Sequence, residues 1–278
     1  MPTAELLLSC ADFTFPLLGH AHALRLIAAI GFTGVDVGLF SGRSHVQPEH
    51  IAANPVGHGD ALKHQLADCG LRLSDVFVQL GDDPSQHAVS EMDAATRDAD
   101  RDRFRRCVEF AHAAGAAHLT GLPGVAVDGG IGRAADETAW RLGVAREAGL
   151  RYAVEPHVGS NCPTVSATQA FVDRVPGLTL TLDYGHFVYQ GQPASDADAL
   201  LPHASHFHAR GGAPGRLQAA LPANVIDFAP MVAQAASAGR TICVEYVWVD
   251  WEHCNEVDNV SETVRLREHL RTLAAKDI

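Results

Sequence analysis

The sequence predicts an α/β fold, a closed (β/α)₈ barrel in which residues 1–278 form a single domain. Three observations predict it. Helix-like stretches end at a glycine and are followed by a short apolar run, eight such runs can be assigned, and their spacing averages about 35 residues, the size of one βα unit. No linker, low-complexity segment or change in composition separates a second domain.

Glycines mark the ends of the predicted helices. A glycine readily adopts the left-handed conformation that ends a helix, after which the chain turns into a strand. Two of the intervening stretches, 104–114 and 228–235, carry apolar residues at helical spacing, which is typical of helices that pack on a sheet. The helix-ending glycines are Gly31, Gly70, Gly115, Gly149, Gly177 and Gly239.

Apolar runs between the predicted helices are the predicted strands. Strands that alternate with helices favour parallel pairing through right-handed crossovers. An open, doubly wound sheet is the competing architecture, but no G-x-G-x-x-G follows the first strand. We therefore prefer the closed barrel. Its predicted strands cover residues 6–10, 35–39, 73–80, 118–122, 152–155, 178–183, 205–210 and 242–247.

Composition and charge argue against several classes of protein. Apolar residues make up 47% of the chain and charged residues 19%, as in an ordinary globular protein with a sizeable core. A net charge of −12 with scattered Lys and Arg argues against nucleic acid as a partner. The N-terminus has no basic leader, and no long apolar stretch occurs, so we expect a cytoplasmic protein that does not contact a membrane. The six cysteines form no C-x-x-C pair.

Each of the last four predicted strands ends in a residue that can bind a metal ion. The carboxyl ends of barrel strands meet on one face, so these side chains should surround a common centre. A single Asp after a strand is usually a turn or helix cap, and a single His is usually solvated or packed. A Glu within an apolar strand is harder to explain without a partner. The four candidate ligands are Glu155, Asp183, His208 and Glu245.

This mixed oxygen and nitrogen set suits one divalent ion per chain. Mn²⁺, Mg²⁺ and Co²⁺ fit such a set in octahedral geometry with positions left for substrate oxygens, and Zn²⁺ remains an alternative. Strand alternation turns His206 to the same side as His208, and we keep His206, with His157, as a second-rank candidate beside the substrate-binding residues His186 and Arg210.

Several short motifs resemble those of the xylose isomerase-like TIM-barrel superfamily, specifically its sugar phosphate isomerase/epimerase group. That group includes ketose 3-epimerases, hydroxypyruvate isomerase, inosose dehydratase and endonuclease IV. The resemblance covers nearly the whole chain and implies the same four metal ligands, with His186, three residues after Asp183, in contact with substrate. The motifs are VEPH, LDYGH, HFHAR, GRLQ followed by IDF, and VEYVW.

One motif departs from the pattern of the group. Relatives often read His-x-Lys-Asp after the seventh strand, whereas this chain reads His208-Ala209-Arg210-Gly211. Arg210 is therefore a candidate substrate-binding cation in place of the lysine, and the alternative is a surface or salt-bridged side chain.

A mechanism follows from these residues as an expectation. A hydroxy-ketone that binds the metal ion through its carbonyl and hydroxyl oxygens has an acidified C–H bond. We expect Glu155 and Glu245 to be the catalytic residues on opposite sides of the resulting planar enediolate, one removing a proton and the other returning it. Return to the same carbon gives epimerisation, and return to the neighbouring carbon gives isomerisation.

Other residues are expected to bind the substrate. His186 and Arg210 would hold its hydroxyls or a carboxylate, and His157 would lie at the pocket mouth. Trp248 and Trp251 would stack on the apolar face of a sugar, or simply pack the last loop.

Three alternatives use the same barrel. A dehydratase of the inosose type shares the metal and the first proton abstraction, and a non-catalytic sugar-binding barrel would predict a broken ligand set. An abasic-site endonuclease needs further histidines on early strands, which read GVDVGL and VFVQLG here. We expect a small sugar or keto-sugar as partner, and a homo-oligomer is compatible with such a barrel.

Overall fold

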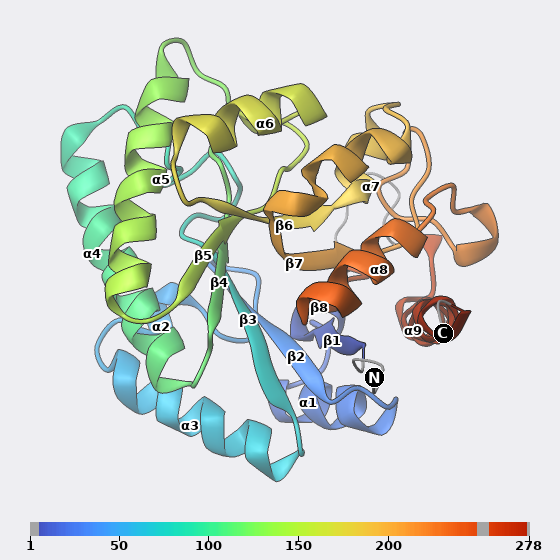
Figure 1. Cartoon of the computed structure of the whole chain (residues 1–278). Coiled ribbons are helices and arrows are strands. Elements are labelled where there is room, and N and C mark those ends of the chain that lie inside the picture. The colour runs from blue at the N-terminus through green and yellow to red at the C-terminus, as the bar shows by residue number, and fades with distance from the viewer. Residues whose placement is uncertain (1–5, 249–255, 277–278) are drawn as a thin grey trace.

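The computed structural model describes residues 6–248 and 256–276. Within these residues eight parallel strands form a closed barrel in which β1 also pairs with β8, as Figure 1 shows. The predicted closed barrel is confirmed, and the open sheet is rejected. The strands are β1 (Leu7–Ala11), β2 (Gly34–Phe40), β3 (Arg72–Gln79), β4 (His118–Gly121), β5 (Arg151–Val154), β6 (Thr179–Asp183), β7 (Ala204–Ala209) and β8 (Thr241–Val244).

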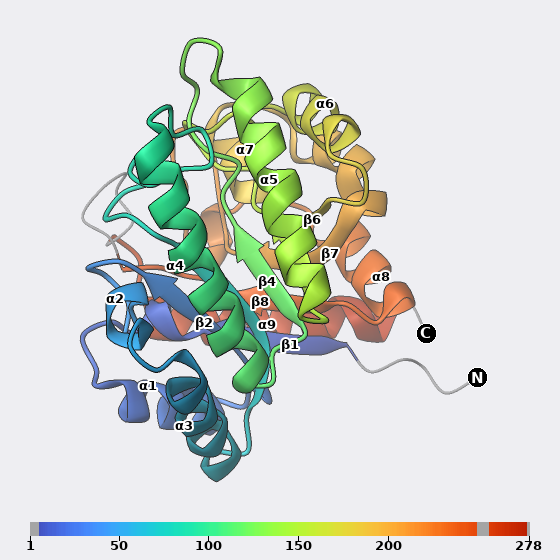
Figure 2. The same ribbon diagram turned by 90° about the vertical axis from the view of Figure 1, so that its left-hand side faces the viewer.

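Helices cover the outside of the barrel (Figures 1 and 2). None of those in the described ranges is long and apolar enough to cross a membrane. The helices are α1 (His20–Ala29), α2 (Pro48–Ile51), α3 (Pro55–Asp68), α4 (Ala94–Ala113), α5 (Gly130–Glu147), α6 (Val165–Arg174), α7 (Tyr184–Tyr189), α8 (Ala229–Ala238) and α9 (Asn259–Lys276).

The glycines predicted to end helices do so in the left-handed conformation. At the end of α8, Gly239 has φ 60° and ψ 40°, which a residue with a Cβ adopts only at an energetic cost. The amide of Gly239 then donates to the carbonyl of Ala236, which closes the helix before β8 begins. The other five predicted glycines also have positive φ angles, between 67° and 91°.

Successive side chains of a strand point to opposite faces, so the barrel has an apolar layer outside its strands and a separate interior within them. On β7, Phe207 points outward into the apolar layer between strands and helices, whereas His206 and His208 point into the barrel. The apolar layer is large and continuous. The barrel lumen, by contrast, is polar and buried, and hydrogen bonds cross it between non-adjacent strands. Its polar residues are Ser9, Asp36, Asp75, His118, Thr120, Thr181, His206 and His208.

Two helix glycines allow a test of how tightly α3 packs on α4. A Cβ on Gly59 would lie 2.5 Å from the carbonyl oxygen of Phe110 and 2.7 Å from the Cβ of Ala113. We expect Gly59→Ala to lower the free energy of unfolding by about 1–3 kcal/mol, because neither backbone nor Cβ can move aside easily. Gly143 in α5 has nothing within 4 Å of such a Cβ. Gly143→Ala should therefore raise stability by about 0.5–1 kcal/mol through helix propensity alone.

Urea unfolding of both variants beside the wild type measures the difference. If both variants were more stable than the wild type, helix propensity and not close packing would determine the effect of Gly59→Ala on the free energy of unfolding.

Candidate functional site

The four predicted metal ligands lie at the carboxyl ends of the last four strands. Asp183 is the last residue of β6, His208 lies near the end of β7, and Glu155 and Glu245 directly follow β5 and β8. All four side chains are buried. The backbone amides of Glu155 and Glu245 donate to the carbonyls of Gly121 and Ala209 on the neighbouring strands, which continues the sheet as far as these two candidate ligands.

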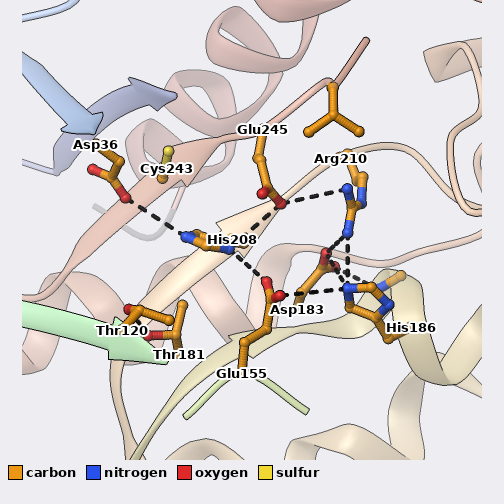
Figure 3. A network of polar contacts seen from close by, with 12 residues as sticks. Asp36, Thr120, Glu155, Thr181, Asp183, His186, His208, Arg210, Cys243 and Glu245 are labelled. Atoms are coloured by element: carbon orange, nitrogen blue, oxygen red, sulfur yellow. Dashed lines mark hydrogen bonds and ion pairs between the residues drawn. The ribbon is translucent and has the colours of Figure 1, made fainter. Parts of the chain in front are cut away.

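His208 lies between the two glutamates (Figure 3). Its Nδ1 is 2.6 Å from Oε1 of Glu155 and 3.4 Å from Oε2 of Glu245. One potential ligand atom from each of these three residues lies within 4.8 Å of the others. The structure therefore brings three of the four predicted ligands into one buried group.

Asp183 is close to this group but has other partners. Its Oδ1 accepts a hydrogen bond of 2.7 Å from the amide of Gly185, which caps α7. Its Oδ2 accepts one of 2.6 Å from Nη2 of Arg210, and Nη1 of the same guanidinium is 3.4 Å from Oε2 of Glu245. Arg210 is buried and ion-paired, and it joins Asp183 to Glu245 (Figure 3).

The charges in this buried group shift one another's ionisation. Burial, together with the negative charges of Glu155 and Asp183, raises the pKa of Glu245 to about 7, although His208 and Arg210 oppose the shift. Burial also opposes ionisation of Glu155, but the charges and hydrogen bonds of His208 and His186 outweigh it and hold the pKa of Glu155 well below its usual range. Burial disfavours a charged His208, yet the carboxylates of Glu245 and Glu155 outweigh it and raise the pKa of His208.

The residues present fit a divalent cation. Oε2 of Glu245 is buried and meets its charged neighbours, His208 and Arg210, only at 3.4 Å, without a hydrogen bond in the described structure, which is costly for a carboxylate oxygen in an interior. Two carboxylates and an imidazole are ligand types that Mn²⁺, Mg²⁺, Co²⁺ and Zn²⁺ all accept. Protonated His208 and Arg210 supply the positive charge that a bound ion would otherwise bring.

Two further predicted residues lie beside the group. Nε2 of His186 is 2.9 Å from Nη2 of Arg210 and 3.7 Å from carboxylate oxygens of Glu155 and Asp183. The rings of His157 and His186 lie 4.2 Å apart, and burial, with the neighbouring His186, lowers the pKa of His157 to about 4.

A cavity of about 410 Å³ opens over the site. Glu155, His157, Arg210 and Glu245 line it, whereas His186 is buried behind it. Trp248 also lines the cavity and is 43% exposed. Trp251 lies outside the described residues.

The sequence did not predict a role for two aspartates in the barrel lumen, Asp36 and Asp75. Oδ2 of Asp36 on β2 is 2.5 Å from Nε2 of His206 and 3.6 Å from Nε2 of His208. Asp75 on β3 pairs with Asp36 in register and binds Nδ1 of His118 at 2.6 Å. A charged residue in the middle of an apolar strand, such as Asp36 in GVDVGL, indicates a buried carboxylate that needs a partner, and this pattern could have identified it.

The raised pKa of Glu245 predicts a pH effect on the stability of the metal-free protein. A carboxyl with a pKa of about 7 in the folded state and about 4.3 in the unfolded state stabilises the fold in its protonated form. This contribution is complete below pH ~4.3 and is lost as pH rises through 7. Between pH 6 and 8 we expect it to fall by about 1.4 kcal/mol.

Chemical unfolding of wild type and Glu245→Gln at both pH values measures this loss. The comparison with the variant is necessary because buried histidines with a lowered pKa, such as His157, change stability in the opposite direction. Equal pH dependence in the two proteins would show that Glu245 is ionised throughout this range.

Comparisons with known proteins agree with this architecture. A sequence comparison with curated proteins finds no match. Solved structures similar to this chain include a D-allulose 3-epimerase from Methylomonas sp. in complex with D-allulose, at 18% identity, with 97% of each chain covered and a TM-score of 0.72. A probable 3-DHS dehydratase from Bacillus anthracis has 12% identity, covers 94% of this chain and 99% of its own, and has a TM-score of 0.71.

The IOLI protein with a bound zinc atom is also similar, with 14% identity, 98% of this chain and 99% of that chain covered, and a TM-score of 0.71. At these identities the likenesses show the fold. The family described as xylose isomerase-like TIM barrel matches residues 24–273, which is most of the sequence. This chain therefore belongs to the xylose isomerase-like TIM barrel family.

Proposed function

We propose that the protein is a divalent-metal-dependent isomerase or epimerase of a sugar or related hydroxy-ketone. The observation that carries the proposal is the pair of buried carboxylates, Glu155 and Glu245, on either side of His208 at the floor of a cavity. Membership of the family supports it, and so does the shared fold of an epimerase solved with its sugar.

The proposed metal ligands are Glu155, Asp183, His208 and Glu245. Three of them already form a group with ligand atoms within 4.8 Å. Inclusion of Asp183 requires its Oδ2 to leave Arg210, which frees that guanidinium for an anionic or hydroxylated substrate. The ion, when bound, supplies Lewis acidity that polarises a carbonyl and a neighbouring hydroxyl.

Glu155 and Glu245 are the proposed acid and base. Both side chains line the same cavity but project from strands that lie on opposite sides of β7 and β6 in the closed barrel. One carboxylate would accept the proton from carbon, and the other would return a proton from the opposite side.

The remaining site residues have proposed roles in substrate binding. His157 and Arg210 line the cavity and offer hydrogen bonds to hydroxyls or to developing negative charge. His186 touches Arg210 and holds it in place, so a direct contact with substrate requires Arg210 to move. Trp248 offers an aromatic face at the mouth.

Exchange of substrate protons with solvent tests this function. The protein, loaded with Mn²⁺, would be incubated in D₂O with a panel of ketoses and inososes, and deuterium next to the carbonyl would be measured by mass spectrometry. We expect exchange by the wild type, loss of exchange after treatment with EDTA, and a decrease of about 10²-fold or more in both Glu155→Gln and Glu245→Gln. Glu109→Gln on the exposed face of α4 is a matched control.

The products separate the alternatives. Loss of water from the substrate would favour a dehydratase, the activity named for one structure of this fold. Near wild-type exchange by either glutamine variant would contradict the two-base scheme, and no exchange with any substrate would favour a binding protein.

The carboxylate behind His208 gives a second test. Asp36 lies on the Nε2 side of His208, where a carboxylate can orient a metal-binding imidazole and raise its basicity. We expect Asp36→Asn to weaken Mn²⁺ binding by about 10- to 100-fold. Asp100→Asn is the control, because Asp100 is also buried but pairs with His87 and Arg103, away from this group. Calorimetric titration with Mn²⁺ measures both, and equal affinities for the two variants would exclude this role of Asp36.

A further inference from the structure

The walls of the cavity are divided into two chemically different halves. Strands β5 to β8 and the segments after them supply the polar residues described above, together with Leu217, Val247 and Trp248. The first strands and the loops after them supply an apolar half, which includes Phe13, Phe40, Phe77 and Leu122. Phe77 lies beside His208, with ring centroids 5.5 Å apart, so the apolar half begins directly next to the proposed metal site.

Three aromatic rings form this apolar wall. Phe40 meets Phe13 and Phe77 edge to face, with centroids 5.0 and 5.1 Å apart. All three are buried. A linear polyhydroxy ketose carries a hydroxyl on nearly every carbon, and each hydroxyl placed against such a wall would lose its hydrogen bonds to water without replacement. The wall therefore favours a ligand body made mostly of C–H groups.

A single cation lies at the rim of the apolar half. Nη2 of Arg43 donates to Oε1 of Gln79 at 2.8 Å, and Cζ of Arg43 lies 5.5 Å from the centroid of Phe40. The Gln79 amide in turn donates to the carbonyl of Gly81 at 2.9 Å, so its orientation is fixed by both ends of the amide. These contacts hold Arg43 over the cavity, which it and Gln79 line.

Arg43 has no counter-ion among the residues that the structure describes. Within residues 6–248 and 256–276 its side chain donates to Gln79 and forms no ion pair within 4.0 Å, and the charges of Asp83 and Asp82 act on it from a greater distance. Arg210, the other guanidinium of the cavity, is ion-paired with Asp183 and Glu245. Of the two guanidiniums that line the cavity in the described residues, Arg210 is thus committed to the proposed metal site and Arg43 is available to a ligand.

We infer that the substrate of the proposed proton-transfer site is a hydroxy-ketone with an apolar, ring-like body and a carboxylate at the end remote from the reacting carbons, which Arg43 binds. This inference rests on the proposed function for the identity of the reacting end. A carboxylate matches the planar fork of a guanidinium. The nearby charges of Asp82 and Asp83 favour a monoanion over a doubly charged phosphate at this position.

Three probes of increasing complexity test the inference. Dihydroxyacetone carries the reacting group alone, 2-hydroxyacetophenone adds an aromatic body, and 4-(hydroxyacetyl)benzoate adds a carboxylate at the far end. Their affinities for the full-length protein, with and without Mn²⁺, would be measured by calorimetry. We expect each added group to increase affinity, with the carboxylated probe binding at least tenfold more tightly than 2-hydroxyacetophenone.

Variants assign the carboxylate preference to Arg43. Arg43→Gln should reduce the preference for the carboxylated probe to less than twofold, and Arg43→Lys should retain part of it. Arg105→Gln is the matched control, because Arg105 is exposed on α4 and pairs with Asp102. A preference that persists in Arg43→Gln, equal binding of the two aromatic probes, or tightest binding of dihydroxyacetone would each overturn the inference.

Failure of this inference is distinguishable from failure of the proposed function. Calorimetry with the probes reports binding, whereas deuterium exchange, measured on the same probes and on the ketose and inosose panel, reports proton transfer. An Arg43-dependent preference without exchange would contradict the proposed chemistry only, and exchange with simple ketoses without that preference would contradict the proposed substrate only.

Discussion

Compensation of buried negative charge is the constraint on which the candidate site depends. Glu155, Asp183 and Glu245 come together in an interior where an ionised carboxylate without a partner is strongly destabilising. Without metal, Arg210 and a protonated His208 provide the opposite charge, and Glu245 has a raised pKa. A divalent ion would replace the proton of His208, so metal binding and proton release are coupled in this arrangement.

Gly211 explains how the chain accommodates Arg210 in this position. The sequence reads Ala209-Arg210-Gly211 where related motifs often read x-Lys-Asp. A Cβ on Gly211 would lie 2.4 Å from the carbonyl oxygen of Ala219, so an aspartate does not fit. The backbone instead approaches closely enough for the Gly211 amide to donate to the hydroxyl of Tyr246 at 2.9 Å. Arg210 itself pairs with Asp183 at the end of the neighbouring strand β6.

The sequence predicts the barrel and the four strand-end residues because both depend on local periodicity. Glycine positions and apolar runs place each strand within three residues at either end, and a shared face follows from parallel strands. Side-chain contacts between strands are different, since they depend on strand register and on side-chain conformation. The pairing of Asp183 with Arg210, and the position of Asp36 behind His208, therefore emerge only from the folded chain.

Under the proposed function, the two halves of the cavity would separate proton transfer from substrate recognition along the sequence. Strands β5 to β8 provide the charged residues, whereas the first strands provide an aromatic wall with one cation at its rim. Phe77 is where the halves meet, because its ring lies against the ring of His208. An apolar neighbour keeps water from that side of the imidazole and so strengthens its interactions with Glu155 and Glu245. Changes in the early loops can thus alter which ligand fits while the charged group at the ends of the late strands stays the same.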